Sequence, residues 1–126
     1  MEELCSSSVA AREGIDNTPG EEVKARLTEL VDEVLDPLRE WYGRPIRVNS
    51  GFRCPRLNEA VGGVEDSQHV RGEAADIDTG NVVENRRLFE HVRDQLEFDQ
   101  LIWESGGAWV HVSYKKVGNR KQVLSL

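Results

Sequence analysis

The longest periodic pattern in the chain begins at Thr18. Apolar residues recur from there at helical spacing and so share one face: Val23, Leu27, Leu30, Val31, Val34, Leu35, Leu38 and Trp41. The pattern predicts one long amphipathic helix over residues 18–42. Thr18 and Glu21 predict a capping box at its start, Pro37 predicts a kink, and Gly43 predicts its end.

The remaining patterns predict a mixture of short strands and one further helix. Asn81 and Glu84 form a second capping box, and apolar residues follow at helical spacing to about Leu96. A loop, a short helix and a glycine turn are expected over residues 51–63. Alternating or continuous apolar runs predict strands over residues 44–50, 72–78, 98–104 and 108–114, and a further strand in the tail 121–126. Strands mixed with helices, with a hairpin near the end, predict an α+β domain.

Length and composition limit the classes of protein. The chain has 126 residues, the size of a single domain spanning 1–126, and 38% of them are hydrophobic. No apolar run approaches the roughly 20 residues that a membrane span needs, so we expect no membrane partner. The net charge is -7 and the basic residues are scattered, which argues against nucleic acid as a partner.

The N-terminal segment MEELCSSSVAAREG lacks the basic flank and the apolar stretch of a secretory signal. We therefore expect a protein that is cytoplasmic as synthesised and stays there unless something else releases it. Cys5 and Cys54 form neither a C-x-x-C pair nor a disulfide-rich framework, and free thiols are favoured.

Two of the three histidines are candidates for chemistry. His91 lies among charged residues of the second helix, where a solvated surface role is favoured, whereas His69 follows a polar turn and His111 lies in an alternating strand. A catalytic zinc site commonly takes three ligands from His, Asp and Glu and leaves a fourth position for water. His69, Asp76 and His111 could supply such a set. Spacing alone equally allows a capping histidine and a solvent-facing aspartate.

A motif favours the metal site. Ser67, His69, Gly72, Ala74 and Asp76 match the pattern S-x-H-x-x-G-x-A-x-D. This segment resembles the zinc D-alanyl-D-alanine peptidase family, which includes D-Ala-D-Ala carboxypeptidases, D,D-dipeptidases and phage L-alanyl-D-glutamate endopeptidases. The upstream SGFR segment and the downstream WVHVSY segment resemble the same family, so the likeness extends over about residues 48–114.

The resemblance implies a fold and a ligand set. The fold would be that shared by hedgehog signalling domains and D,D-peptidases, with zinc held by His69, Asp76 and His111. It also implies that Arg53 binds a substrate carboxylate or polarises the scissile carbonyl, as a guanidinium beside a metal could do. The alternative for Arg53 is a surface arginine in a loop. Ser67 matches a position close to the substrate, or it is a turn-forming hydroxyl.

The family pattern is broken at the catalytic base. Metal-assisted hydrolysis needs a carboxylate near the attacking water, and the best-known members carry it three positions before the last histidine. Ala108 occupies that position here. If the last two long strands pair as a hairpin closed by residues 105–108, Glu104 lies opposite Trp109 and shares a sheet face with His111. We therefore predict that Glu104 is the base.

Alternatives remain at this site. A one-residue bulge would turn Glu104 to the other face and leave it a surface carboxylate. Asp78, which shares a strand face with Asp76, is the second candidate for the base, although solvation at a strand end is the simpler role. Trp109 would share the face of His111 and wall the substrate cleft, while Trp103 would point into the core.

The prediction is thus a zinc metallopeptidase that hydrolyses D-residue-containing peptide bonds of peptidoglycan stem peptides. Carboxypeptidase and endopeptidase activity stay open. Without a secretory signal, such an enzyme would fit a phage or prophage endolysin that is released to the cell wall by other means. The competing hypothesis is a non-catalytic zinc-binding module with a structural or partner-binding role, which Ala108 favours.

Overall fold

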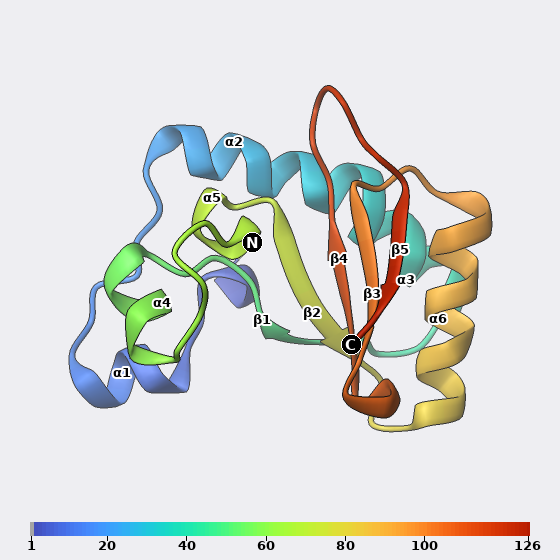
Figure 1. Cartoon of the computed structure of the whole chain (residues 1–126), viewed down its shortest axis with the longest axis horizontal. Coiled ribbons are helices and arrows are strands. Elements are labelled where there is room, and N and C mark those ends of the chain that lie inside the picture. The colour runs from blue at the N-terminus through green and yellow to red at the C-terminus, as the bar shows by residue number, and fades with distance from the viewer. Residues whose placement is uncertain (1) are drawn as a thin grey trace.

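The computed structural model describes residues 2–126 and is built around one five-stranded sheet (Figure 1). Its strands are β1 (Arg47–Ser50), β2 (Ala74–Asp78), β3 (Gln100–Glu104), β4 (Trp109–Ser113) and β5 (Gln122–Ser125). They lie in the order β1-β2-β4-β3-β5. Neighbours are antiparallel except β3 and β5, which are parallel.

Helices flank this sheet and occupy the ends of the molecule (Figure 1). They are α1 (Ser8–Glu13), α2 (Glu21–Leu30), α3 (Asp36–Tyr42), α4 (Pro55–Ala60), α5 (Gln68–Arg71) and α6 (Val82–Gln95). Shorter or irregular turns are η1 (Glu2–Leu4), η2 (Val31–Leu35) and η3 (Ser105–Gly107). The expected α+β class, with a small and mostly antiparallel sheet, is confirmed. None of the helices in residues 2–126 is long and apolar enough to cross a membrane.

The two faces of the sheet differ in chemistry because side chains alternate along each strand. Ala75 and Ile77 of β2 and Val110 and Val112 of β4 are fully buried and pack into the main core. Buried residues of the long helices complete that core: Leu27, Leu30, Val34, Leu35, Leu38, Leu88, Phe89 and Val92. The opposite face of the same strands carries Asp76 and His111, so the core positions this polar face without contributing to it.

The long helix predicted over residues 18–42 begins later than expected, as α2. It starts at Glu21 with Gly20 as its N-cap, and no side chain caps it. Thr18 instead donates from its amide and its hydroxyl to Asp16 Oδ1, at 3.0 and 2.6 Å, so the capping box predicted at Thr18 is wrong. The local Asx turn uses the hydroxyl that the helix would have needed.

The irregularity predicted at Pro37 takes the form of a π-helical turn, η2, just before the proline. The amide of Asp36 donates to the carbonyl of Val31, five residues back. A proline has no amide hydrogen, and a widened turn accommodates this loss without ending the helix. The helix then ends at Gly43 as predicted, in the left-handed conformation with φ of 70°.

The N-terminal residues, for which no element was predicted, form η1 and α1. Ser7 caps α1, and its hydroxyl accepts from the amide of Ala10 at 3.2 Å. Ala10 and Ile15 pack on Leu57 of α4 in a second, smaller apolar cluster. Cys5 and Cys54 are both free, as predicted.

Candidate metal centre

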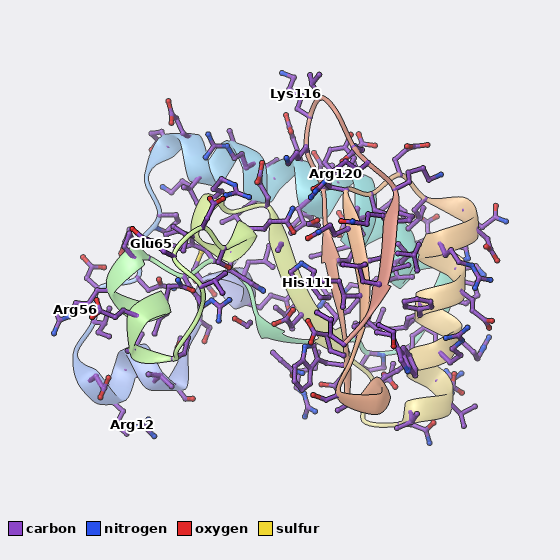
Figure 2. The ribbon with its side chains drawn as sticks, viewed as in Figure 1. Arg12, Arg56, Glu65, His111, Lys116 and Arg120 are labelled. Carbon is purple, nitrogen blue, oxygen red and sulfur yellow. The ribbon has the colours of Figure 1, made fainter. Side chains whose placement is uncertain are left out.

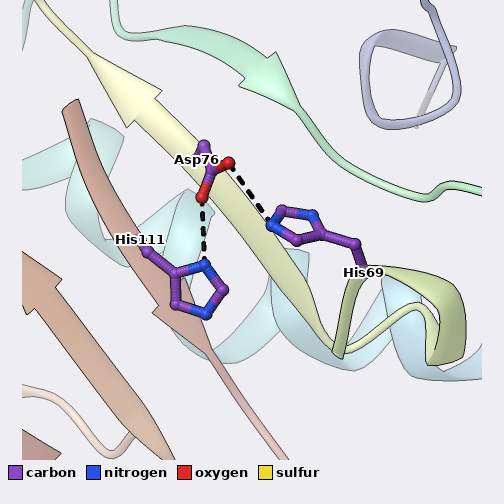
Figure 3. Close-up of side chains that lie close together, drawn as sticks. All are labelled: His69, Asp76 and His111. Carbon is purple, nitrogen blue, oxygen red and sulfur yellow. Dashed lines mark hydrogen bonds and ion pairs between the residues drawn. The ribbon is translucent and has the colours of Figure 1, made fainter. Parts of the chain in front are cut away.

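Three side chains from three different elements converge on one point beside the sheet (Figure 3). His69 lies on α5, Asp76 on β2 and His111 on β4. Asp76 and His111 are direct partners in the β2–β4 ladder, and α5 folds back to place His69 beside them. One potential ligand atom from each residue lies within 4.8 Å of the other two. The three residues predicted as metal ligands are therefore brought together.

The orientation of His69 is set by two backbone contacts. The hydroxyl of Ser67 accepts from the amide of His69 at 3.1 Å and caps α5. His69 Nδ1 lies 2.8 Å from the carbonyl oxygen of Gly51. A carbonyl can only accept, so Nδ1 carries the hydrogen and Nε2 is left with its lone pair. That Nε2 atom lies 3.3 Å from Asp76 Oδ2.

The SGFR segment, residues 50–53, makes close backbone contacts with Leu4 and with His69. A Cβ atom at Gly51 would lie 2.3 Å from the carbonyl oxygen of Leu4, so only glycine fits there. The next amide, of Phe52, donates to that same oxygen at 2.6 Å. The amide of Arg53 donates to the carbonyl of His69 at 3.1 Å. The segment thereby fixes α5 against β1 and presents one carbonyl to the His69 ring.

His111 points its two ring nitrogens at different partners. Nδ1 lies 3.0 Å from Asp76 Oδ1, and Nε2 lies 3.2 Å from Oε1 of Gln68. The rings of His111 and His69 meet edge to face, with centroids 5.2 Å apart. Figure 2 shows His111 between the strands at the middle of the molecule.

Asp76 lies between the two rings, with Oδ1 toward His111 Nδ1 and Oδ2 toward His69 Nε2. Burial raises the pKa of Asp76, but rings that carry protons on these nitrogens outweigh burial and hold the pKa well below its ordinary value. A metal ion would take the place of those protons. A carboxylate facing two imidazole nitrogens forms a set of acceptors that needs a cation between them. Two imidazole nitrogens and one carboxylate oxygen form a donor set that suits a divalent transition metal with a ligand position left open. The residues present therefore fit the metal that the sequence implied.

Arg53 lies next to this centre and is half-buried, which rules out a surface arginine. Its Nη2 donates to Ser67 Oγ at 3.4 Å, and its buried Nε atom has no hydrogen-bond partner within residues 2–126. Burial lowers the pKa of Arg53, and the nearby Asp76 carboxylate opposes that shift. A buried guanidinium with spare donors is suited to binding an anionic or polarised oxygen.

Glu104 lies on the sheet face that carries Asp76 and His111. The β3–β4 hairpin pairs Glu104 with Trp109 and Ile102 with His111, without a bulge, which is the register expected from the sequence. Burial and the Asp76 carboxylate raise the pKa of Glu104, while His111 and His69 oppose the rise. The side chain therefore lies within electrostatic reach of all three.

Asp78 is buried at the end of β2, with both carboxylate oxygens in hydrogen bonds. It is only 3% exposed and accepts from Arg47 Nη2, from Asn49 Nδ2 at 2.6 Å and from the amide of Gly80 at 2.6 Å. These contacts tie β1 to β2 and hold the following turn. The solvation expected for Asp78 at a strand end is therefore wrong, and its role as a second candidate for the base stays a prediction.

The two tryptophans lie on opposite faces of the hairpin. Trp103 packs edge to face on Phe89, with centroids 5.5 Å apart, at the margin of the core as expected. Trp109 is half-buried and shares the strand face of His111. Ser67 is only 8% exposed, and its hydroxyl serves the cap of α5 and Arg53. Contact of Ser67 or Trp109 with a substrate stays a prediction.

Residues 1–113 match the family described as peptidase M15. The chain belongs to the peptidase M15 family. The resemblance inferred from the SxHxxGxAxD motif and its two flanking segments is thus confirmed. Within the curated relatives, the zinc D-Ala-D-Ala carboxypeptidase of Streptomyces albus G is 47% identical over 48 residues, which is 37% of this chain. The matched segment spans 19% of the length of that relative.

The contacts that the Gly51 carbonyl, Gln68 and Asp99 make around the candidate ligands were not predictable from the sequence. Gln68 lies at a variable position of the motif, between Ser67 and His69, where spacing says nothing about its partner. Asp99 lies before β3 and reads as an ordinary loop carboxylate, yet it is fully buried. Only the packing of α5 against the end of the sheet brings these residues together.

Proposed function

We propose that the protein is a zinc peptidase that hydrolyses D-residue-containing peptide bonds in peptidoglycan stem peptides. The observation that carries this proposal is the convergence of His69, Asp76 and His111, with Glu104 and Arg53 beside them. Membership of the M15 family supports the peptidase chemistry. The similarity to a zinc D-Ala-D-Ala carboxypeptidase supports the choice of metal and of substrate class.

In this proposal the protein's own groups carry proton transfer and charge stabilisation. Zinc, when bound by the three ligands, supplies a Lewis acid that polarises the scissile carbonyl and acidifies the attacking water. Glu104 accepts the proton of that water and returns it to the leaving amine. A carboxylate can serve both steps, because it accepts a proton as a base and its protonated form then donates that proton as an acid.

Arg53 binds the oxygen on which negative charge develops, or the terminal carboxylate of the peptide. A cavity of about 230 Å³ adjoins Arg53 and is lined also by Ser6, Ser7, Asn49, Ser50 and Phe52. Val9, Leu57 and Val61 also contribute to the lining, and this mixture of polar and apolar groups suits a peptide segment. Trp109 provides an apolar wall on the face of His111, and Ser67 keeps Arg53 in place.

The proposal is tested by Glu104→Gln, which keeps the size of the side chain and removes its ability to accept a proton. Loss of a general base lowers turnover by about 10²–10⁴-fold. We expect that loss on purified muropeptides, measured by mass spectrometry of the digest, with zinc binding retained. Glu40→Gln, at an exposed position on α3, is the matched control and should cleave like the wild type. Unchanged cleavage by Glu104→Gln would remove Glu104 from the mechanism.

The same digest identifies the bond that is cut. Release of a terminal D-residue indicates a carboxypeptidase, and cleavage inside the stem peptide indicates an endopeptidase. The competing function is a non-catalytic zinc-binding module, which the alanine at position 108 favours. Zinc binding by the wild type without cleavage of any muropeptide would establish that alternative in place of the peptidase.

A further inference from the structure

Behind His111, on the side away from Asp76, lies a chain of buried polar contacts that the proposed mechanism does not use. His111 Nε2 meets Gln68 Oε1 at 3.2 Å, and Gln68 Nε2 donates to Asp99 Oδ2 at 2.7 Å. Asp99 is 0% exposed and Gln68 is 8% exposed. Arg120 closes the chain from the surface side, donating from Nε and Nη2 to the two Asp99 oxygens at 3.0 and 2.8 Å.

The direction of every hydrogen bond in this chain follows from its outer end. A guanidinium can only donate, so Arg120 requires acceptors, and both oxygens of the Asp99 carboxylate supply them. A carboxylate cannot donate, so Gln68 must turn its amide nitrogen toward Asp99. The carbonyl oxygen of Gln68 then faces His111 and can only accept. His111 Nε2 must therefore carry the ring hydrogen.

This direction matters at the metal centre. A neutral imidazole with its hydrogen on Nε2 has its lone pair on Nδ1, and Nδ1 is the atom that faces Asp76 Oδ1 at 3.0 Å (Figure 3). His69 is fixed in the opposite sense by the Gly51 carbonyl, which leaves Nε2 for the metal. The two histidines thus need different tautomers, and each has its own acceptor to select it.

We propose that Gln68 is a positioning residue that selects the metal-binding tautomer of His111, and that Asp99, held by Arg120, fixes the amide of Gln68 in the orientation this requires. The inference rests on the proposed metal centre. It gives a function to Gln68, which lies at a variable position of the motif, and to Asp99 and Arg120, which lie outside the motif. Gln68 touches neither the substrate nor the metal in this arrangement and acts only through His111.

The first variant is Gln68→Met, which keeps the length of the side chain and removes the acceptor. Loss of such an outer hydrogen bond typically weakens metal binding by about 10–100-fold. We expect a change of that size in the zinc dissociation constant, measured by competition with a chromogenic chelator. Gln95→Met, at an exposed position near the end of α6, is the matched control and should leave zinc affinity unchanged.

Exchanging the amide and the carboxylate between positions 68 and 99 tests whether the orientation of the amide matters, rather than packing alone. In Asp99→Asn, Arg120 draws the new amide oxygen, so the amide nitrogen faces Gln68, whose own amide turns and presents a donor to His111. Asp99→Asn should therefore weaken zinc binding by about tenfold or more. In Gln68→Glu, two carboxylates share a proton across the 2.7 Å contact, and an acceptor still faces His111, so zinc affinity should change little. The double variant Q68E/D99N again presents a hydrogen-bond acceptor to His111 and keeps the net charge of the protein. Its zinc affinity should therefore return to near that of the wild type.

The tautomer is read directly from imidazole nitrogen spectra of the zinc-loaded protein. We expect His111 to show a protonated Nε2 and a metal-bound Nδ1 in the wild type and in Q68E/D99N. Coordination through Nε2, or an Asp99→Asn variant with unchanged zinc affinity and spectra, would overturn the proposal, as would a double variant no better than Asp99→Asn. These readouts do not involve cleavage. A protein that binds zinc in this way but cuts no muropeptide would refute the proposed function and leave the role of Gln68 standing.

Discussion

At the residue scale, the site depends on groups that are buried with part of their bonding capacity unused. The convergent acceptors of His69, Asp76 and His111 are one instance. The Nε atom of Arg53, which has no hydrogen-bond partner among residues 2–126, is another. A buried donor without a partner costs free energy in the folded protein, so it is retained where a ligand supplies the missing acceptor. Substitution of Arg53 should therefore affect cleavage of the substrate more than the stability of the fold.

We predict that Arg53→Lys lowers kcat/KM for muropeptide cleavage by about 10²-fold, the loss typical of one oxyanion donor. A lysine keeps the charge but lacks the planar donor fork. Zinc affinity should stay the same, as measured by chelator competition. Arg56→Lys on α4 is the control, because Arg56 is exposed and points outward (Figure 2). Equal activity of the two variants would show that Arg53 has no role in the reaction.

At the scale of elements, the β3–β4 hairpin decides where Glu104 lies. Its closing turn contains two glycines with positive φ that differ in their surroundings. A Cβ atom at Gly107, where φ is 94°, would lie 2.2 Å from the ring of Trp103, whereas a Cβ at Gly106 would meet nothing within 4 Å. The turn thus packs on Trp103, and this contact fixes the connection that keeps Glu104 opposite Trp109.

We predict different costs for the two alanine substitutions in this turn. Gly106→Ala should lower the free energy of unfolding by about 1 kcal/mol, the cost of the left-handed backbone alone. Gly107→Ala adds a clash with the indole and should cost about 3 kcal/mol. Urea denaturation of both variants measures the difference. Similar midpoints would mean that Trp103 moves aside easily and does not hold the turn.

The elements near the motif were predictable from sequence, and the reasons are local. Alternation in FDQLIWE and AWVHVSY, with a short glycine turn between them, was enough to predict the register that places Glu104. The start of the first helix was not predictable, because Thr18 has a competing partner in Asp16. Gln68 and Asp99 could not be paired from the sequence either, since their contact depends on how α5 packs against the end of the sheet.

At the scale of the whole molecule, Asp99 joins segments that are distant in sequence. It accepts from Gln68 on α5 and from Arg120 just before β5, and the charge of Lys115, which follows β4, lies 3.9 Å away. The hydrogen bonds of Arg120 outweigh the effect of burial and lower the pKa of Asp99 to about 2. A buried carboxylate that is ionised in the fold makes stability depend on pH.

The sign follows from the two pKa values. The folded pKa of Asp99 is about 2 against an ordinary 3.8, so its contribution to stability is complete above about pH 4 and is lost as the pH falls toward 2. The difference amounts to about 2 kcal/mol. We predict that the free energy of unfolding of the wild type, measured in urea with a chelator present, falls more steeply between pH 4 and 2 than that of Asp99→Asn.

Asp99→Asn also weakens hydrogen bonds and so lowers stability at every pH. The comparison therefore uses the slope of the free energy of unfolding against pH, which that constant loss does not change. The residues of the metal site are the same in both proteins and contribute equally to the two slopes. Asp32→Asn, at an exposed position in η2, should keep the slope of the wild type. Parallel slopes for the wild type and Asp99→Asn would mean that Asp99 is not ionised in the fold. The direction of the Gln68 amide would then lose its anchor, because a protonated Asp99 could donate to Gln68 and reverse it.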